Sequence, residues 1–118
     1  MTTETEYKMT TEEHKAAAAV ILQQLGGRQF IAMVGAKHLS VDDRLNTPNM
    51  GCEIKAGTKV THMTIVLDPD DTYTMKLIRI RGSKLTVVDE TSGLYCDMLQ
   101  DHFTEITGLN TTLGTLGR

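Results

Sequence analysis

The segment 21–37, ILQQLGGRQFIAMVGAK, constrains the fold of this chain more than any other stretch. Apolar residues with helical spacing end at two successive glycines, Gly26 and Gly27. Because glycine readily adopts the left-handed conformation that closes a helix, we expect the helix to end at Gly26. Residues 29–34 follow at once, are rich in β-forming side chains and are apolar on both alternating faces. They predict a strand that is covered on both sides or lies centrally in the sheet.

The helix before these glycines is predicted to begin at Thr10. Thr10 and Glu13 have the spacing of a capping box, in which each side chain accepts a hydrogen bond from the backbone N–H of the other residue. Residues 16–19 are four successive alanines, and alanine is the strongest helix former. An N-terminal helix is therefore expected over the residues up to Gly26.

The sequence predicts a loop over residues 35–50 and then a series of short strands separated by turn-forming residues. These strands are expected at residues 51–56, 60–67, 72–81 and 84–89. Gly82 and Ser83 form a two-residue hairpin turn, which makes the last two strands antiparallel.

A C-terminal helix is predicted by apolar residues that recur three and four positions apart between Leu94 and Ile106. Thr91 or Ser92 is expected to cap its start, and Gly108 to close its end. Together these elements indicate a single α+β domain, with a mostly antiparallel sheet of about five strands and one helix at each end of the chain.

The 118 residues fit one domain of ordinary size. We assign this domain to residues 10–109, preceded by a flexible arm (residues 1–9) and followed by a flexible tail (residues 110–118). No apolar run approaches the roughly 20 residues that a membrane span needs, so no membrane association is expected. The polar N-terminus lacks the apolar stretch of a secretory signal, which favours the cytoplasm. Cys52 and Cys96 are expected to be reduced and partly buried.

Four cations, Lys76, Arg79, Arg81 and Lys84, crowd one short segment that contains no acidic residue. Arg79 and Arg81 share one strand face, and Lys84 begins the partner strand just beyond the turn. Such a β-ribbon can contact nucleic-acid phosphates or an acidic protein surface. The alternative, which the sequence favours, is a charged edge that prevents aggregation. The net charge of −3 also argues mildly against nucleic-acid binding.

Gly35, Ala36 and Lys37 follow the predicted strand of residues 29–34 and form a candidate anion-binding site. The order of a phosphate-binding loop, in which a strand precedes a glycine loop that ends in GK[ST] and opens a helix, is absent. Two small residues and a cation at a strand end can nevertheless approach a ligand closely, so a ligand or partner contact is predicted there.

No residue set has the pattern of a catalytic or metal site. The aspartates of residues 68–71 could bind a hard cation, but they lack the spacing of a calcium loop and are more typical of a turn. The four histidines are not paired with one another or with a cysteine at metal-ligand spacing. The sequence therefore predicts a protein without enzymatic activity and without a cofactor.

The motif ILxQLGGxxFxAMxGAK of residues 21–37 resembles that of a family of small, mostly uncharacterised proteins from bacteriophages and prophages. The likeness extends to Tyr73, to RIRGxK over residues 79–84, to YxDxL over residues 95–99, to Phe103 and to TGL over residues 107–109. Val34 stands where the family often has threonine. The resemblance carries no catalytic residues; it implies an accessory phage protein that is expressed in the cytoplasm of a bacterial host.

The leading hypothesis is thus a non-enzymatic phage accessory protein that binds a host defence protein or its nucleotide signal. One alternative is a nucleic-acid-binding protein that uses the basic hairpin, and another is a small metal-dependent hydrolase that uses the aspartates of residues 68–71. A homo-oligomer is compatible with the strand predicted to be apolar on both faces and with the seven methionines.

Overall fold

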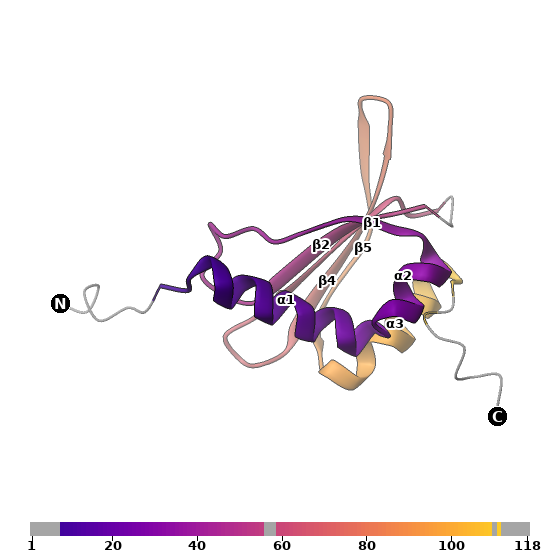
Figure 1. Cartoon of the computed structure of the whole chain (residues 1–118). Helices are drawn as coiled ribbons and strands as arrows, with labels where there is room; N and C mark the ends of the chain where they lie inside the picture. The colour runs from indigo at the N-terminus through magenta and orange to yellow at the C-terminus, as the bar shows by residue number, and fades with distance from the viewer. Residues whose placement is uncertain (1–7, 56–58, 110, 112–118) are drawn as a thin grey trace.

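The computed structural model describes residues 8–55, 59–109 and 111. The elements are, in chain order, helices α1 (Thr11–Leu25) and α2 (Arg28–Val34), strands β1 (Ala36–Ser40), β2 (Asn49–Ile54), β3 (His62–Leu67), β4 (Tyr73–Arg81) and β5 (Lys84–Leu94), the 3-10 turn η2 (Cys96–Met98) and helix α3 (Leu99–Thr107). Each strand pairs antiparallel with the next, in the order β1-β2-β3-β4-β5. The helices lie together on one side of this sheet (Figure 1). The predicted α+β architecture is confirmed.

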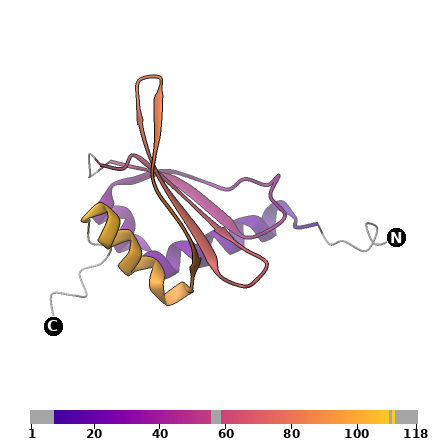
Figure 2. The same cartoon turned by 180° about the vertical axis from the view of Figure 1, so that it is seen from behind.

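The core lies between the helices and the sheet. Phe30 of α2 and Phe103 of α3 are fully buried, and their rings meet edge to face with centroids 5.4 Å apart. From the sheet, alternate residues of the central strands are fully buried in the same core, including Met63, Ile65 and Leu77. Because strand side chains alternate, the residues between them line the opposite side of the sheet, which we call the open face. In both views the helices lie on the other side of the sheet (Figures 1 and 2).

Helix α1 begins and ends as predicted. The Thr10 hydroxyl accepts from the Glu13 N–H at 3.1 Å, and the Glu13 carboxylate accepts from the Thr10 N–H at 2.8 Å. Gly26 caps the other end at a φ of 125°, in the range that favours glycine. Among the described residues, no helix is both long enough and apolar enough to span a bilayer.

The prediction of a strand over residues 29–34 is wrong, because these residues form α2. Phe30 and Val34 lie four positions apart, one helical turn, and both are fully buried. A short apolar run fits a buried helix as well as a buried strand, and packing against α1 and α3 decides between them. Gly27 and Gly35, both with positive φ, bound this short helix at its two ends.

The expected loop over residues 35–50 contains a strand that the sequence analysis missed. β1 pairs with β2 through Ala36 opposite Ile54 and Lys37 opposite Glu53. The pairing then becomes irregular at His38, whose φ is 55°, before it resumes at Ser40. This irregularity breaks the alternation of buried and exposed residues that marks a regular strand.

The predicted strands over residues 51–56, 60–67 and 72–81 are present as β2, β3 and β4, but β5 is longer than expected. It runs to Leu94, so the prediction that Thr91 or Ser92 caps the last helix is wrong. Two register shifts in the pairing with β4 obscure the alternation of β5. Leu94 nevertheless lies opposite Tyr73 and is buried. Helix α3 begins only after η2, and Gly108 closes it as predicted.

The predicted arm and tail fall mostly outside the described residues. At Met9, the backbone N–H donates to Asn46 Oδ1 at 2.7 Å. Thr111 is buried, and its hydroxyl donates to Gln100 Oε1 at 2.9 Å. Both cysteines are free, as expected, but only Cys52 is buried.

Candidate binding site on the β4–β5 ribbon

Strands β4 and β5 extend beyond the helices as a two-stranded ribbon, which we define as residues 78–87. It begins where the register shifts between Leu77 and Ile78, and it projects from the body of the molecule in both views (Figures 1 and 2). Gly82, at a φ of 58°, forms the predicted hairpin turn. The facing pairs are Ile78 with Val87, Arg79 with Thr86, Ile80 with Leu85, and Arg81 with Lys84.

One face of the ribbon is basic. The side chains of Arg79, Arg81, Lys84 and Thr86 surround a hollow of about 380 Å³. The alternation of the two strands places these four residues on one side, as predicted for the two arginines and Lys84. This is the side of β4 that carries the core residues nearer the body of the molecule, but no helix reaches the ribbon (Figure 1).

Lys76, the fourth cation of this cluster in the sequence, lies elsewhere. It is separated from Arg79 by an odd number of positions on the same strand, so it points to the open face. There it faces Thr64 of β3 and Glu90 of β5 in the register of the sheet. The predicted group of four cations is therefore a group of three.

Two of the three cations on the basic face, Arg79 and Lys84, are not paired with a carboxylate of the described residues. Asp89 faces the same side at the base of the ribbon, but its carboxylate accepts from His102 Nε2 at 2.8 Å and from the Thr91 hydroxyl at 2.9 Å. Burial raises the pKa of Asp89, but these two hydrogen bonds and the electrostatic attraction of His102 together leave the pKa below its usual value. The hollow is thus suited to an anionic group.

Gly35, Ala36 and Lys37 have structural roles that the sequence analysis did not assign. Gly35 ends α2 in the left-handed conformation, at a φ of 64°. Ala36 is buried in the core, and Lys37 is exposed on β1, opposite Glu53. Because β1 and β5 are the two opposite edges of the sheet, the fold does not bring these three residues to the ribbon.

A groove that the sequence analysis missed crosses the open face. Its volume is about 390 Å³, and its lining includes His38, Glu53, His62, Thr64, Ile78 and Ile80. Gly51 also lines this groove and contributes no side chain to fill it. The Glu53 carboxylate lies 3.2 Å from Lys55 Nζ and 3.4 Å from His38 Nε2, and the hydrogen bond from Lys55 lowers its pKa.

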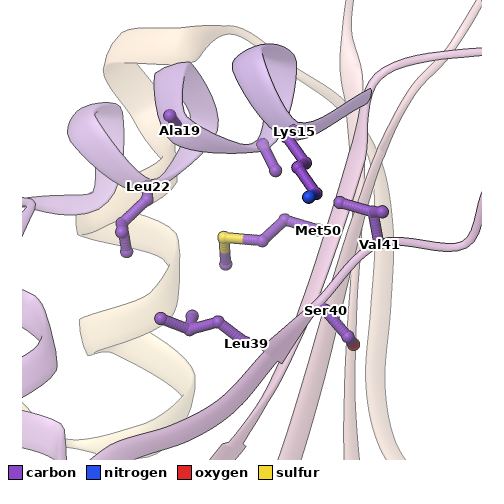
Figure 3. A pocket seen from close by; sticks show the side chains of 8 residues that line it. Lys15, Ala19, Leu22, Leu39, Ser40, Val41 and Met50 are labelled. Atoms are coloured by element: carbon purple, nitrogen blue, oxygen red, sulfur yellow. The ribbon is translucent and has the colours of Figure 1, made fainter. Parts of the chain in front are cut away.

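A second concave surface that the sequence did not reveal lies between α1 and the end of β1 (Figure 3). This cleft has a volume of about 280 Å³ and is mostly apolar; its lining includes Ala19, Leu22, Leu39, Val41 and Met50. Lys15 is the one charged residue among those that line it. The irregular pairing of β1 helps to explain why sequence periodicity did not reveal the contribution of Leu39.

The aspartates of residues 68–71 form a turn. The Asp71 N–H donates to the Asp68 carbonyl at 3.0 Å, and the Asp70 carboxylate accepts from the Thr72 N–H and hydroxyl. The hydrogen bonds from Thr72 lower the pKa of Asp70. In the part of the chain that the structure describes, no three His, Cys, Asp or Glu side chains are grouped so as to hold a metal ion.

Comparison of the chain with protein-family models, with curated proteins and with solved structures gives no match. The candidate site is thus defined by its own geometry: a projecting ribbon with three cations and a hydroxyl around one hollow.

Proposed function

We propose that this protein acts by binding, without catalysis, and that the basic face of the ribbon contacts the phosphate groups of a nucleic acid. The observation that carries this proposal is the convergence of Arg79, Arg81 and Lys84 on one hollow. Arginine and lysine are the main donors to phosphate in protein–DNA contacts, and the Thr86 hydroxyl is a further donor. A two-stranded ribbon has dimensions that the major groove of duplex DNA admits.

The number of cations sets the expected strength of binding. Each phosphate that a protein cation neutralises contributes about −0.9 to the slope of log K against log salt for duplex DNA. Three such contacts predict a slope of about −2.7, which corresponds to weak binding that is best measured at low salt. These residues would contact the phosphate backbone of the nucleic acid and not the edges of its bases. We therefore expect them to give little preference for a particular base sequence.

The test measures fluorescence anisotropy of a labelled DNA duplex at several salt concentrations. Replacing Arg79→Gln together with Lys84→Gln is expected to weaken binding and to reduce the magnitude of the slope by about 2. Arg79→Gln and Lys84→Gln are also made singly, and Lys76→Gln is the matched control for each of them, because it removes one positive charge from the other face of β4. It is expected to leave the slope and the affinity close to those of the native protein.

Two results contradict the proposal. If no complex forms at low salt, the basic face does not bind duplex DNA. If Lys76→Gln weakens binding as much as the loss of either ribbon cation does, the affinity follows net charge and is not a property of the hollow.

A second candidate function is favoured by the cleft between α1 and β1. Its apolar walls and the single charge of Lys15 are complementary to an apolar side chain with a carboxylate beside it, as a protein partner can present. This candidate corresponds to the accessory phage role that the motif of residues 21–37 implies, in which the partner is a host defence protein. That role, the nucleotide signal as a ligand and the location in the host cytoplasm stay predictions.

A pull-down from host lysate tests this second candidate with three forms of the protein. Leu39→Glu places a negative charge in the cleft, whereas Val20→Glu places one on α1 outside the residues that line it. A host protein that the native chain and the Val20 variant retain, but the Leu39 variant loses, supports the cleft as its contact. If the native chain retains neither a protein nor a nucleotide, the second candidate is removed.

A further inference from the structure

The face of the ribbon opposite its basic residues is apolar and exposed. Ile80, Leu85 and Val87 are 37%, 59% and 46% exposed, and the register places Ile80 beside Leu85 and Val87 beside Ile78. A two-stranded ribbon that packs against nothing is marginally stable in water. Covering these side chains would remove apolar surface from water, which is favourable. Burial of this apolar face against a partner is therefore favourable.

This apolar face is continuous with the groove on the open face. Ile78 and Ile80 belong to both, since they lie on the ribbon and also line the groove. From these two residues the groove crosses β3 at His62 and Thr64 and reaches β2 at Gly51. The two features thus form one surface, on the side of the sheet opposite the helices (Figures 1 and 2).

We propose that two copies of this chain form a symmetric dimer through this surface, with the apolar side of each ribbon lying in the groove of the other copy. In a dimer with two-fold symmetry, the ribbon of each copy contacts the groove of the other, so the same ribbon–groove contact occurs twice. This repetition matters because a stable interface buries about 1,200–2,000 Å² in total. The three exposed side chains of one ribbon are too few for that area, whereas two ribbons and two grooves together provide a much larger surface.

The distribution of charge favours the same partner. The whole chain carries −3, and the ribbon contributes +3 from Arg79, Arg81 and Lys84 with no acidic residue, so the rest of the chain carries −6. The ribbon of one copy is therefore attracted to the body of another, which speeds their encounter. In the dimer the three cations point away from the groove and keep their contact with water, so their desolvation does not oppose association.

The experiment is a measurement of native mass by light scattering and sedimentation velocity on the full chain over a wide range of concentrations. The native protein is expected to be a dimer. Leu85→Asp together with Val87→Asp is expected to abolish the dimer, since it places charges on the apolar face. Arg79→Gln with Lys84→Gln is the matched control on the other face of the same ribbon and is expected to stay dimeric.

A second variant tests the groove itself. A Cβ at Gly51 would lie 3.5 Å from Ser40 Oγ, Thr64 Cγ2 and the Met63 carbonyl oxygen, which is ordinary contact distance. Gly51→Tyr should therefore fold, as circular dichroism and urea unfolding will verify, while its ring occupies the groove. We expect this variant to be monomeric.

A native protein that is monomeric at every concentration overturns the proposal. So does a Gly51→Tyr variant that remains dimeric, because ribbons would then pair with something other than the groove. The proposal does not depend on nucleic-acid binding: the Arg79 and Lys84 variant separates the two, since it should lose DNA affinity and keep the dimer.

Discussion

At the scale of single residues, the two cysteines differ in ways that only their surroundings explain. Cys52 lies on β2 among core side chains, whereas Cys96 is exposed in η2. Burial raises the pKa of Cys52 to about 12, because the charged thiolate is disfavoured away from water. Since the thiolate is the reactive form, Cys52 should be inert at neutral pH.

We expect a thiol reagent such as Ellman's reagent to modify one cysteine rapidly in the native protein and two after unfolding in urea. Cys96→Ser should remove the rapid phase and leave a thiol that reacts only after unfolding. Rapid modification of both thiols in the native protein would show that Cys52 is accessible, contrary to its position in the core.

At the scale of elements, the helix–strand boundary at Gly35 depends on one backbone conformation. Gly35 has a φ of 64°, its N–H donates to the Ile31 carbonyl, and its own carbonyl accepts from the Lys55 N–H at 3.2 Å. These bonds allow α2 to end and β1 to begin within one residue. A side chain at this position would clash with the backbone in the left-handed conformation.

Gly35→Ala is therefore expected to lower the free energy of unfolding by about 1–2 kcal/mol. Gly35→Asn should lower the free energy of unfolding by less, because asparagine tolerates this conformation better than alanine does. Urea unfolding of the native protein and of the two variants measures the order of their stabilities. Equal stability of the alanine variant and the native protein would mean that α2 ends in a different conformation.

At the scale of the whole molecule, the two sides of the sheet differ in what they contact. One side carries the helices and the core, and the other offers the groove. The His102–Asp89 contact, at 2.8 Å, ties α3 to β5 near the base of the ribbon. It thus connects the C-terminal helix to the strand that presents the candidate binding site.

This contact predicts how stability depends on pH. Because the folded state holds the pKa of Asp89 below its usual value, the stabilisation is complete above the unfolded pKa of about 3.9 and is lost as the pH falls through the lower folded value. Asp89→Asn should destabilise the protein by about 1 kcal/mol at neutral pH. Urea unfolding of both proteins should show this difference shrinking toward zero in acid; a difference that does not change with pH would contradict the role of the charge.

Local patterns in the sequence predicted several elements correctly, because they depend on residues that are near one another in the chain. The capping box of Thr10 and Glu13, the helix end at Gly26 and the hairpin turn at Gly82 are of this kind. The alternation of Arg79 and Arg81 also placed both arginines on one face of the ribbon.

Tertiary structure decided what local patterns leave open. Residues 28–34 form a helix that buries Phe30 and Val34 one turn apart in the core, where Phe30 meets Phe103 of α3. Strand β1 exists because β2 pairs with it across an irregularity. Lys76 lies apart from the other cations, and the groove exists because four strands bring their open sides together around Gly51. The sequence by itself thus determined the ends of α1 and the hairpin, where the interactions are local. Contacts between distant segments determined the identity of α2 and the shape of both faces of the sheet.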